Sequence, residues 1–464
     1  KMPDRHILIL AAGKGTRMRS SRPKVLHQLA GLTLIEHVIR ASIPLKATTT
    51  TVVLGHQRPL VSQVLTNSSS VSCSIVHQKQ QLGTAHALLQ AEPVLGNKSG
   101  TLIVLSGDAP LISSLTLSAL VETHEQSTAA ASVLSSVIER PYGYGRVLRD
   151  KRGQLVGVVE EADASTVQRK ICEVNSGIYT FDLPPLFQTL KEIPEAGPKN
   201  ERYLPAILQM YGQRKLPINV TITDDPHEIR GINSQSELAE VRTIVRQRKN
   251  ESLMASGVTI EDPATTYIDT DVTVEADTVI HPGVFLEGRT RVGARCEIHS
   301  GSRIVNSTLS DDVTINNHSV IADSVIKAKA RVGPFAHIRP GSTVGESSRV
   351  GNFVELKKTA LGTGAKANHL SYIGDAVIGS NSNIGAGTIT CNYDGVNKHQ
   401  TTIGPEVFVG SGTELVAPVT IGRGAYIGAG SCITENVPAN ALALARGRQV
   451  IKEARATKIR KNPE

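Results

Sequence analysis

A glycine-containing segment near the start of the chain brings cationic side chains close to backbone amides. This segment, Leu10–Met18 (LAAGKGTRM), overlaps the end of the aliphatic run Ile7–Leu10. It is not a P-loop, because GxxxxGK(S/T) is absent, and not a GxGxxG motif, because Met18 stands at the third position. Arg17 and the nearby Lys24 would place two cations beside N–H groups that can bind a triphosphate. The glycine turn alone is equally typical of an ordinary strand-to-helix connection.

An aspartate follows another aliphatic run. Asp108 comes just after Leu102–Leu105, preceded by Gly107. A carboxylate at the end of a buried strand is well placed to bind Mg²⁺, a hard cation that prefers oxygen ligands. Most aspartates at this position instead cap the following helix, so both interpretations stay open for Asp108.

The elements that would position these residues alternate between strands and helices. Ile7–Leu10, Thr51–Leu54 and Leu102–Leu105 are aliphatic runs followed by glycine-containing turns and helix-like segments. The pattern predicts a Rossmann-like, mostly parallel, doubly wound α/β sheet, in which ligands bind at the carboxyl ends of the strands. Ser234 is expected to cap a linker helix over residues 234–256. We expect that helix to carry Leu238, Val241 and Val245 on one face.

The second half of the chain has a different period. Aliphatic residues recur every six positions in three runs, which are Ile268, Val274, Ile280, Leu286, Val292, Ile298 and Ile304; Val332, Ile338, Val344, Val350 and Leu356; and Ile403, Val409, Leu415, Ile421, Ile427 and Ile433. A spacing of six fits neither an amphipathic helix nor a hairpin meander. It predicts a parallel β-helix of hexapeptide repeats, whose triangular coils take about 18 residues and turn at Gly, Asn and Asp.

An interruption of this period predicts a loop that leaves the β-helix. Residues 390–402 contain the polar sequence CNYDGVNKHQ, which breaks the spacing of six. Loops on rigid repeat scaffolds often carry function. We therefore expect four parts: a first domain over 1–233, the linker helix over 234–256, the β-helix over 257–440 and a tail over 441–464.

Composition and charge exclude several classes of protein. With 40% hydrophobic and 20% charged residues and no Trp, the chain should fold around small aliphatic side chains. The longest plain apolar run, residues 7–12, is too short for a membrane span or a signal-peptide core, so we expect no membrane partner. Five cysteines without a CxxC pair argue against a disulfide or zinc-ribbon framework and favour the cytoplasm.

The net charge of +8 is concentrated in the tail. Residues 446–464 contain seven basic and two acidic side chains, which gives 7 − 2 = +5. Because the rest is nearly balanced and lacks a basic, aromatic-rich face, we expect no nucleic-acid partner. The tail is either a solvated segment or a cationic lip over an anionic ligand.

Motifs in both halves resemble a known family. LAAGKGTRM, RPKVL at 22–26, QLGTAHA at 81–87, GDAP at 107–110 and GYGR at 143–146 resemble the sugar-1-phosphate nucleotidyltransferases. Together with NHLSY at 368–372 and GAGTITCNYDG at 385–395, they resemble the bifunctional bacterial N-acetylglucosamine-1-phosphate uridyltransferase/glucosamine-1-phosphate acetyltransferases, over about residues 5–450.

For the first half, the resemblance implies Mg²⁺-dependent uridylyl transfer from UTP to N-acetylglucosamine-1-phosphate, with release of pyrophosphate. The implied nucleotide-binding residues are Leu10, Ala11, Ala12, Gly13, Arg17, Lys24, Gln78, Gln81, Gly83 and Thr84. The implied sugar contacts are Gly145, Glu160, Asn175 and Asn233, and the implied metal ligands are Asp108 and Asn233. Ser106 stands where related enzymes can carry a tyrosine in the sugar pocket.

For the second half, the resemblance implies acetyl transfer from acetyl-CoA to glucosamine-1-phosphate, with His369 as the catalytic base. Glu355 would polarise or orient its imidazole. The implied sugar-phosphate contacts are Arg339, Lys357, Tyr372 and Asn383, with Lys398 as a sugar or loop contact. The implied acetyl-CoA contacts are Ala386, Asn392, Tyr393, Ser411, Ala429 and Arg446, the last of which opens the basic tail.

The resemblance also implies a homotrimer of left-handed β-helices, with the acetyltransferase site between subunits. The periodicity of the sequence shows neither the handedness nor the trimer. The product would be UDP-N-acetylglucosamine, which serves peptidoglycan and lipopolysaccharide synthesis. Two alternatives stay open. One is a single-activity sugar-1-phosphate nucleotidyltransferase with a structural β-helix, and the other is a scaffolding protein that has lost its chemistry.

Overall fold

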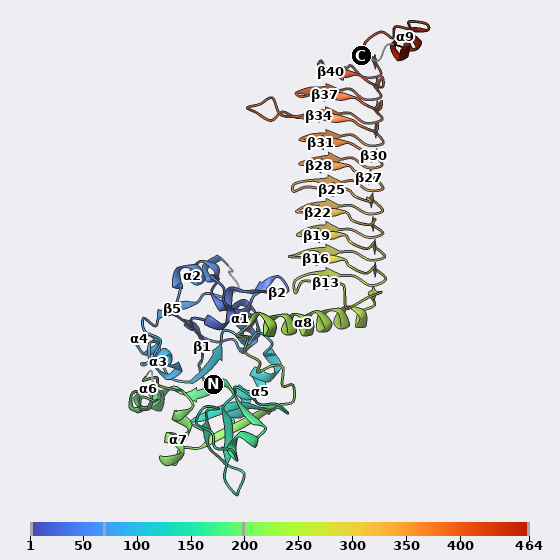
Figure 1. The fold of residues 1–464 in the computed structure, drawn as a ribbon. Coiled ribbons are helices and arrows are strands. Elements are labelled where there is room, and N and C mark those ends of the chain that lie inside the picture. The colour runs from blue at the N-terminus through green and yellow to red at the C-terminus, as the bar shows by residue number, and fades with distance from the viewer. Residues whose placement is uncertain (1–2, 68–70, 197–199, 462–464) are drawn as a thin grey trace. The chain divides into compact units, whose positions relative to one another are not determined.

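The computed structural model describes residues 3–67, 71–196 and 200–461 and divides into two compact units. Unit 1 is Lys1–Val245 and unit 2 is Arg246–Glu464. Figure 1 shows a mixed α/β unit and a long stack of short strands. Among the described residues, none of the helices has the length and apolar character needed to span a bilayer.

Unit 1 is built on a sheet with the path β11-β7-β10-β6-β1-β4-β5, which β8 and β9 extend beside β10. The strands are β1 (Arg5–Ala11), β4 (Thr49–Leu54), β5 (Ser74–His77), β6 (Thr101–Ser106), β7 (Ala131–Val137), β8 (Arg146–Arg149), β9 (Leu155–Val159), β10 (Glu173–Asp182) and β11 (Ile218–Thr223), with a separate ribbon of β2 (Gln28–Leu29) and β3 (Leu32–Thr33). The neighbours β6, β1, β4 and β5 are parallel, as expected, whereas β10 runs antiparallel to both β6 and β7.

Helices cover both faces of this sheet. They are α1 (Leu34–Ser42), α2 (Arg58–Asn67), α3 (Thr84–Leu89), α4 (Glu92–Leu95), α5 (Ser114–Glu125), α6 (Leu183–Glu192) and α7 (Ala206–Gln213), with short 3₁₀ turns η1 (Thr16–Met18), η2 (Lys24–Leu26), η3 (Ile43–Leu45) and η4 (Gln168–Lys170). Alternation along β1 sends Ile7 and Ile9 into the core shared with α1, α2 and α5. Leu8 enters the core shared with α3, α6 and α7. The sheet is therefore doubly wound, as the sequence predicts.

The helix expected over 234–256 is α8 (Gln235–Ala255). Its first turn is capped as predicted, because the Glu237 amide donates to Ser234 Oγ at 3.2 Å. Leu238 and Val241 are fully buried within unit 1. The later turns pack within unit 2, where Asn250 Nδ2 donates to the carbonyl oxygens of Pro263 and Thr266. The division between the two units falls inside this helix.

Unit 2 is a parallel β-helix of three stacked sheets, visible as the column of short arrows in Figure 1. The first sheet contains β12 (Thr259–Ile260), β15 (Val279–Ile280), β18 (Glu297–Ile298), β21 (Thr314–Ile315), β24 (Arg331–Val332), β27 (Arg349–Asn352), β30 (Lys366–His369), β33 (Asn383–Ile384), β36 (Phe408–Val409), β39 (Tyr426–Ile427) and β41 (Leu442–Ala443). The second contains β13 (Tyr267–Ile268), β16 (Phe285–Glu287), β19 (Arg303–Val305), β22 (Val320–Ala322), β25 (His337–Ile338), β28 (Glu355–Lys357), β31 (Tyr372–Gly374), β34 (Ile389–Cys391), β37 (Glu414–Val416) and β40 (Cys432–Ile433). The third contains β14 (Thr273–Val274), β17 (Arg291–Val292), β20 (Thr308–Leu309), β23 (Val325–Ile326), β26 (Thr343–Val344), β29 (Ala360–Leu361), β32 (Ala376–Ile378), β35 (Thr401–Ile403) and β38 (Val419–Ile421).

The repeated aliphatic residues form the core of this β-helix. Ile280, Ile298 and Ile338, like the rest of the predicted series, point inward and are buried. Each strand pairs in parallel with the strand one coil later, an architecture consistent with the predicted left-handed β-helix. The predicted period slips where coils shorten by one residue, so that Arg291 pairs with Thr308, 17 positions along the chain, instead of 18.

Two segments depart from the regular coils. The expected loop lies between β34 and β35 and projects from the stack in Figure 1. A bridge between Tyr393 and Lys398 closes it, and Asp394 accepts from the amides of Val396 and Asn397. The β-helix continues to β41, slightly beyond the expected start of the tail at 441. The tail then carries a short helix, α9 (Arg455–Lys461).

Candidate functional sites

A cavity of about 530 Å³ opens in unit 1 at the carboxyl ends of β1, β5 and β6. It is lined by most of the residues that the sequence predicts for the first site, namely Leu10, Ala11, Ala12, Gly13, Lys24, Gln78, Gln81, Gly83, Thr84, Asp108, Gly145, Glu160 and Asn175. Ser106, Tyr144, Tyr179 and Tyr203 line it as well. Arg17 and Asn233 are the predicted residues that are not part of this lining, and the Arg17 side chain lies exposed on η1.

The turn before α3 shapes one wall of the cavity. Gly83 has φ +95°, and a Cβ there would lie 2.4 Å from the carbonyl oxygen of Arg202, so this position requires glycine. The buried Gln78 donates from Nε2 to the Gly83 carbonyl oxygen at 3.1 Å and lies 2.9 Å from His86 Nδ1. This wall is therefore rigid and carries amide groups that can read the edge of a base.

A cation-binding cluster lies at the end of β6. The Lys24 ammonium contacts the Asp108 carboxylate and donates to Asn233 Oδ1 at 3.0 Å. Ser106 Oγ donates to the other carboxylate oxygen of Asp108 at 2.6 Å. Because Asp108 and Asn233 hold one ammonium between them, their oxygens are close enough to share a cation. Asp108 therefore points into the site and does not cap a helix.

Another part of the cavity lining can hold a neutral polar ligand. The Asn175 amide N–H donates to the carbonyl oxygen of Gly145 at 2.9 Å, and Asn175 Nδ2 donates to the Tyr179 hydroxyl at 2.7 Å. Burial raises the pKa of the Glu160 carboxyl, and the nearby Asp163 raises it further. Hydroxyl groups of a sugar are suitable partners for this combination of amide and carboxyl groups.

The second candidate site lies on one edge of the β-helix. Asn352 and His369 are register partners on neighbouring coils, and His369 Nδ1 lies 2.9 Å from Asn352 Oδ1. An amide oxygen can only accept a hydrogen bond, so this contact places the imidazole proton on Nδ1. The Nε2 lone pair is then available to accept a proton, as a general base requires.

The residues predicted to contact acetyl-CoA continue the same edge. The register of the first sheet places Ala386, Ser411 and Ala429 above His369, one coil after another. The Gly412 amide donates to the Ala386 carbonyl, and the Gly430 amide donates to that of Ser411. Arg446 Nη1 donates to the Ala429 carbonyl at 2.8 Å, so the first basic residue of the tail is held at the top of this row.

A cluster of charges lies on the neighbouring second sheet. Lys357 Nζ donates to Asp375 Oδ2 at 2.8 Å, and the same oxygen accepts from Asn392 Nδ2 at 2.6 Å. Asn392 Nδ2 is also 3.3 Å from the Tyr372 hydroxyl. The hydrogen bond with Asp375 raises the pKa of Lys357, whereas contact with Lys357 lowers the pKa of Lys398. Two lysines this close together favour an anion such as a phosphate.

The expected role of Glu355 differs from what the structure contains. In the described chain Glu355 Oε1 accepts from Arg339 Nη1 at 2.9 Å, and Asn352 is the partner of the His369 imidazole. Asn352 lies 17 residues, or one short coil, before His369. Asn383 lies on β33, next to Lys366 in the register, and Tyr393 is exposed in the projecting loop.

Comparison with known proteins matches both units. The Nucleotidyl transferase family matches residues 6–224, the GMPPB C-terminal domain matches 266–342, and the Bacterial transferase hexapeptide (six repeats) family matches 400–435. The Bifunctional protein GlmU of Koribacter versatilis is 46% identical over 458 residues, which cover 98% of this chain and 97% of the relative. The chain belongs to the GlmU family.

Other members of the GlmU family give the same result. The proteins from Shouchella clausii and Staphylococcus haemolyticus are 45% and 46% identical, and each match covers 97% of this chain and 98% of the relative. As a GlmU family member with both domains, the chain is a bifunctional enzyme with uridyltransferase and acetyltransferase activities. The single-activity and scaffolding alternatives are therefore set aside. Nucleotidyltransferases of this family use a divalent metal ion and act on small-molecule substrates.

Proposed function

We propose that this enzyme makes UDP-N-acetylglucosamine in two steps. Acetyl-CoA first acetylates glucosamine-1-phosphate at the His369 edge of unit 2. UTP then transfers a uridylyl group to N-acetylglucosamine-1-phosphate in the cavity of unit 1, and pyrophosphate leaves. The observation that carries the proposal is that the two units hold two different clusters. In unit 1, the oxygens of Asp108 and Asn233 surround the Lys24 ammonium; in unit 2, Asn352 contacts the His369 imidazole.

In the acetyl-transfer step, His369 Nε2 accepts the proton that the sugar amine loses as its nitrogen attacks the thioester carbonyl. The C–N bond forms, the C–S bond breaks and coenzyme A leaves as the thiolate, which then takes up a proton. Lys357 and Arg339 would bind the sugar phosphate, and Asn383 and Tyr372 the sugar. Arg446 and the row of Ala386, Ser411 and Ala429 would bind acetyl-CoA, with Asn392 and Tyr393 contributing from the loop.

In the uridylyl-transfer step, the backbone of residues 10–13 and Lys24 would bind the triphosphate of UTP, joined by Arg17 when its exposed side chain turns toward the ligand. Gln78, Gln81, Gly83 and Thr84 would surround the uracil. Gly145, Glu160, Asn175 and Asn233 would position the sugar so that its phosphate attacks the α-phosphate in line. The chain supplies position and charge for this reaction and forms no covalent intermediate.

Mg²⁺ is the metal ion that best fits this site. Asp108 and Asn233 supply a carboxylate and an amide oxygen, hard ligands that together already hold the Lys24 ammonium. When bound there, Mg²⁺ would neutralise the developing charge on the phosphates. Lys24 would then move from Asp108 to a phosphate oxygen, since both cations compete for the same carboxylate.

We further propose that the enzyme is a homotrimer in the cytoplasm. His369 is exposed on the single chain, and so are the stacked rings of Phe408 and Tyr426, 4.6 Å apart on the first sheet. Neighbouring copies of the chain would cover these exposed aromatic rings and enclose the site at His369. Free thiols at all five cysteines suit a reducing compartment. Light scattering should give about three times the 49.5 kDa of one chain.

A coupled assay with glucosamine-1-phosphate, acetyl-CoA, UTP and Mg²⁺ tests the two-site proposal. Asp108→Ala should abolish formation of the UDP-sugar and leave thiol release from acetyl-CoA intact, whereas His369→Ala should do the reverse. His318→Ala, which removes an exposed histidine elsewhere on the β-helix, serves as the matched control and should change neither rate. Loss of both activities in either folded single-site variant would refute the assignment of two independent sites.

A further inference from the structure

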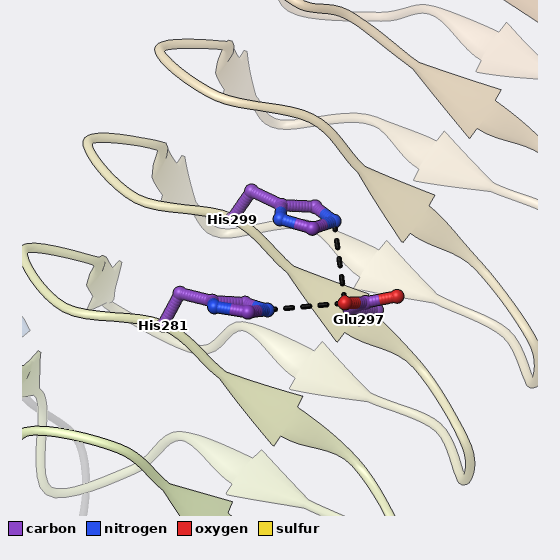
Figure 2. A group of neighbouring side chains, drawn as sticks. All are labelled: His281, Glu297 and His299. Atoms are coloured by element: carbon purple, nitrogen blue, oxygen red, sulfur yellow. Dashed lines mark hydrogen bonds and ion pairs between the residues drawn. The ribbon is translucent and has the colours of Figure 1, made fainter.

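A group of ionisable side chains far along the β-helix from His369 has no part in either reaction. Figure 2 shows His281 and His299 one above the other, with Glu297 beside both. The imidazole rings stack with centroids 4.4 Å apart. Glu297 Oε1 lies 3.1 Å from His281 Nε2 and 3.4 Å from His299 Nε2. One nitrogen from each histidine therefore faces the same carboxylate oxygen.

The register of the β-helix fixes this convergence. Ile280 and Ile298 are buried register partners on β15 and β18, so the residues that follow them, His281 and His299, both point outward. Glu297 precedes Ile298 and points outward on the same face. Cys296, one residue earlier, is buried inside the β-helix and cannot reach the group.

The two distances from Glu297 Oε1 to the histidine nitrogens are near those around a tetrahedral metal ion. Imidazole nitrogen and carboxylate oxygen bind Zn²⁺ at about 2.0–2.2 Å, and tetrahedral angles then separate neighbouring ligand atoms by roughly 3.3–3.5 Å. The two contacts of Glu297 are 3.1 and 3.4 Å, and all three ligand atoms lie within 4.8 Å of one another. The side chains are only partly exposed, at 21%, 47% and 26% for His281, Glu297 and His299, so one side remains open to solvent.

A second carboxylate orients one of the histidines. Glu261 Oε2 lies 3.0 Å from His281 Nδ1 and comes from the coil below. Accepting the Nδ1 proton would leave the Nε2 lone pair of His281 to bind the ion, which would replace the present hydrogen bond between Nε2 and Glu297; such a carboxylate partner is common around metal-bound histidines. Glu261 and Glu297 bring two carboxylates to the histidines, and a divalent cation would balance their charge.

We propose that His281, Glu297 and His299 form a Zn²⁺ site on unit 2, with a water molecule as the fourth ligand and Glu261 holding His281 in place. Two imidazoles and one carboxylate are the donors of a borderline transition metal, not of Mg²⁺. The ion would tie two consecutive coils together and stabilise the β-helix by binding only its folded form. This metal is distinct from the one proposed at Asp108.

Metal titration of the full-length protein tests this site. After removal of metal with EDTA, the wild-type protein should bind one more equivalent of Zn²⁺ than the His281→Ala/His299→Ala double variant. His318→Ala is the matched control. It removes another stacked histidine of the β-helix, whose described ring contact is with Phe335 and not with a carboxylate, so this variant should keep the wild-type stoichiometry. Equal stoichiometry in the wild-type protein and the double variant would overturn the proposal.

Three further measurements keep the test independent of misfolding. Glu297→Gln is nearly isosteric, yet it should also lose the equivalent. Glu261→Gln should keep it with an affinity lower by about 10- to 100-fold. In the wild-type protein, Zn²⁺ at a hundredfold excess over its Kd should raise the unfolding midpoint of the β-helix by about 5 °C. Retention of full affinity by Glu297→Gln, or displacement of Zn²⁺ by millimolar Mg²⁺, would refute a transition-metal site.

Discussion

The hydrogen bond between Asn352 and His369 offers the sharpest test of how the β-helix performs acetyl transfer. Asn352 Oδ1 lies 2.9 Å from His369 Nδ1, and both residues end their strands on neighbouring coils. If this contact fixes the tautomer and the direction of the imidazole, Asn352 is a positioning residue. Replacing it by alanine leaves the His369 imidazole in place and removes only the side chain that orients it.

The size of the effect follows from the exposure of the pair. A hydrogen bond between partly solvated groups contributes about 1 kcal/mol net, which corresponds to about fivefold in rate. We therefore expect Asn352→Ala to lower kcat for acetylation about fivefold, with little change in KM, because no substrate contact is lost. Asn352→Asp should keep the contact but favour imidazolium over neutral imidazole, and thus move the acid limb of the pH–kcat profile up by about one unit.

Thiol release from acetyl-CoA between pH 5.5 and 9 measures both effects, and uridylyl transfer by the same preparation is the internal control. His318→Ala again serves as a matched β-helix variant. An unchanged kcat in Asn352→Ala, together with an unshifted profile in Asn352→Asp, would refute the positioning role. A parallel loss of uridylyl transfer would show general damage to the protein and refute the expectation of a local effect.

Two further predictions concern unit 1. Ser106→Ala removes the 2.6 Å hydrogen bond to Asp108. It should raise the Mg²⁺ concentration for half-maximal uridylyl transfer by about fivefold and leave acetylation unchanged. An unaltered Mg²⁺ dependence would show that Ser106 does not orient the Asp108 carboxylate. Burial would raise the pKa of Glu173, but hydrogen bonds from Arg149 and Ser135 outweigh burial and lower this pKa. The Arg149–Glu173 pair therefore stabilises the fold at pH values above the unfolded-state pKa of Glu173. This stability is lost as the pH falls through the folded-state pKa. Arg149→Met should therefore destabilise unit 1 by about 1 kcal/mol at pH 7, measured by urea unfolding, and the difference should shrink toward zero below roughly pH 4; a difference that stays constant with pH would contradict this assignment.

The core of the β-helix could be predicted from the sequence because its signal is local. Each buried aliphatic residue, such as Ile298 or Ile338, lies between outward-pointing neighbours, and the interval of six repeats wherever the coil is regular. The shortened coils could not be placed in the same way. The sequence reveals a slip in phase, but the pairing of Arg291 with Thr308 identifies the corner that lost a residue.

The site residues were harder to predict where they depend on pairing across coils or across the sheet. Glu355 was expected to polarise or orient the His369 imidazole. In the described chain Glu355 pairs with Arg339, and Asn352 occupies the register position next to the imidazole. In unit 1, Lys24 is 84 residues from Asp108 and 209 from Asn233. No spacing pattern connects such residues. The strand ends suggested Lys24 and Asp108 separately, and the resemblance to a family joined them with Asn233 in one site.

The two units therefore gather chemistry in different ways. In unit 1 the sheet brings together loops that are far apart in sequence, and the site depends on many independent connections. In unit 2 one coil separates the partners, as in Asn352 with His369, Lys357 with Asp375, and His281 with His299. Outward positions 17 or 18 residues apart are held beside each other by a continuous backbone ladder, so a pair of ionisable residues at that spacing meets before any ligand binds. The proposed acetyltransferase base and the proposed zinc site then depend on the same geometric property, and in such a protein the coil length is the spacing at which to search for further sites.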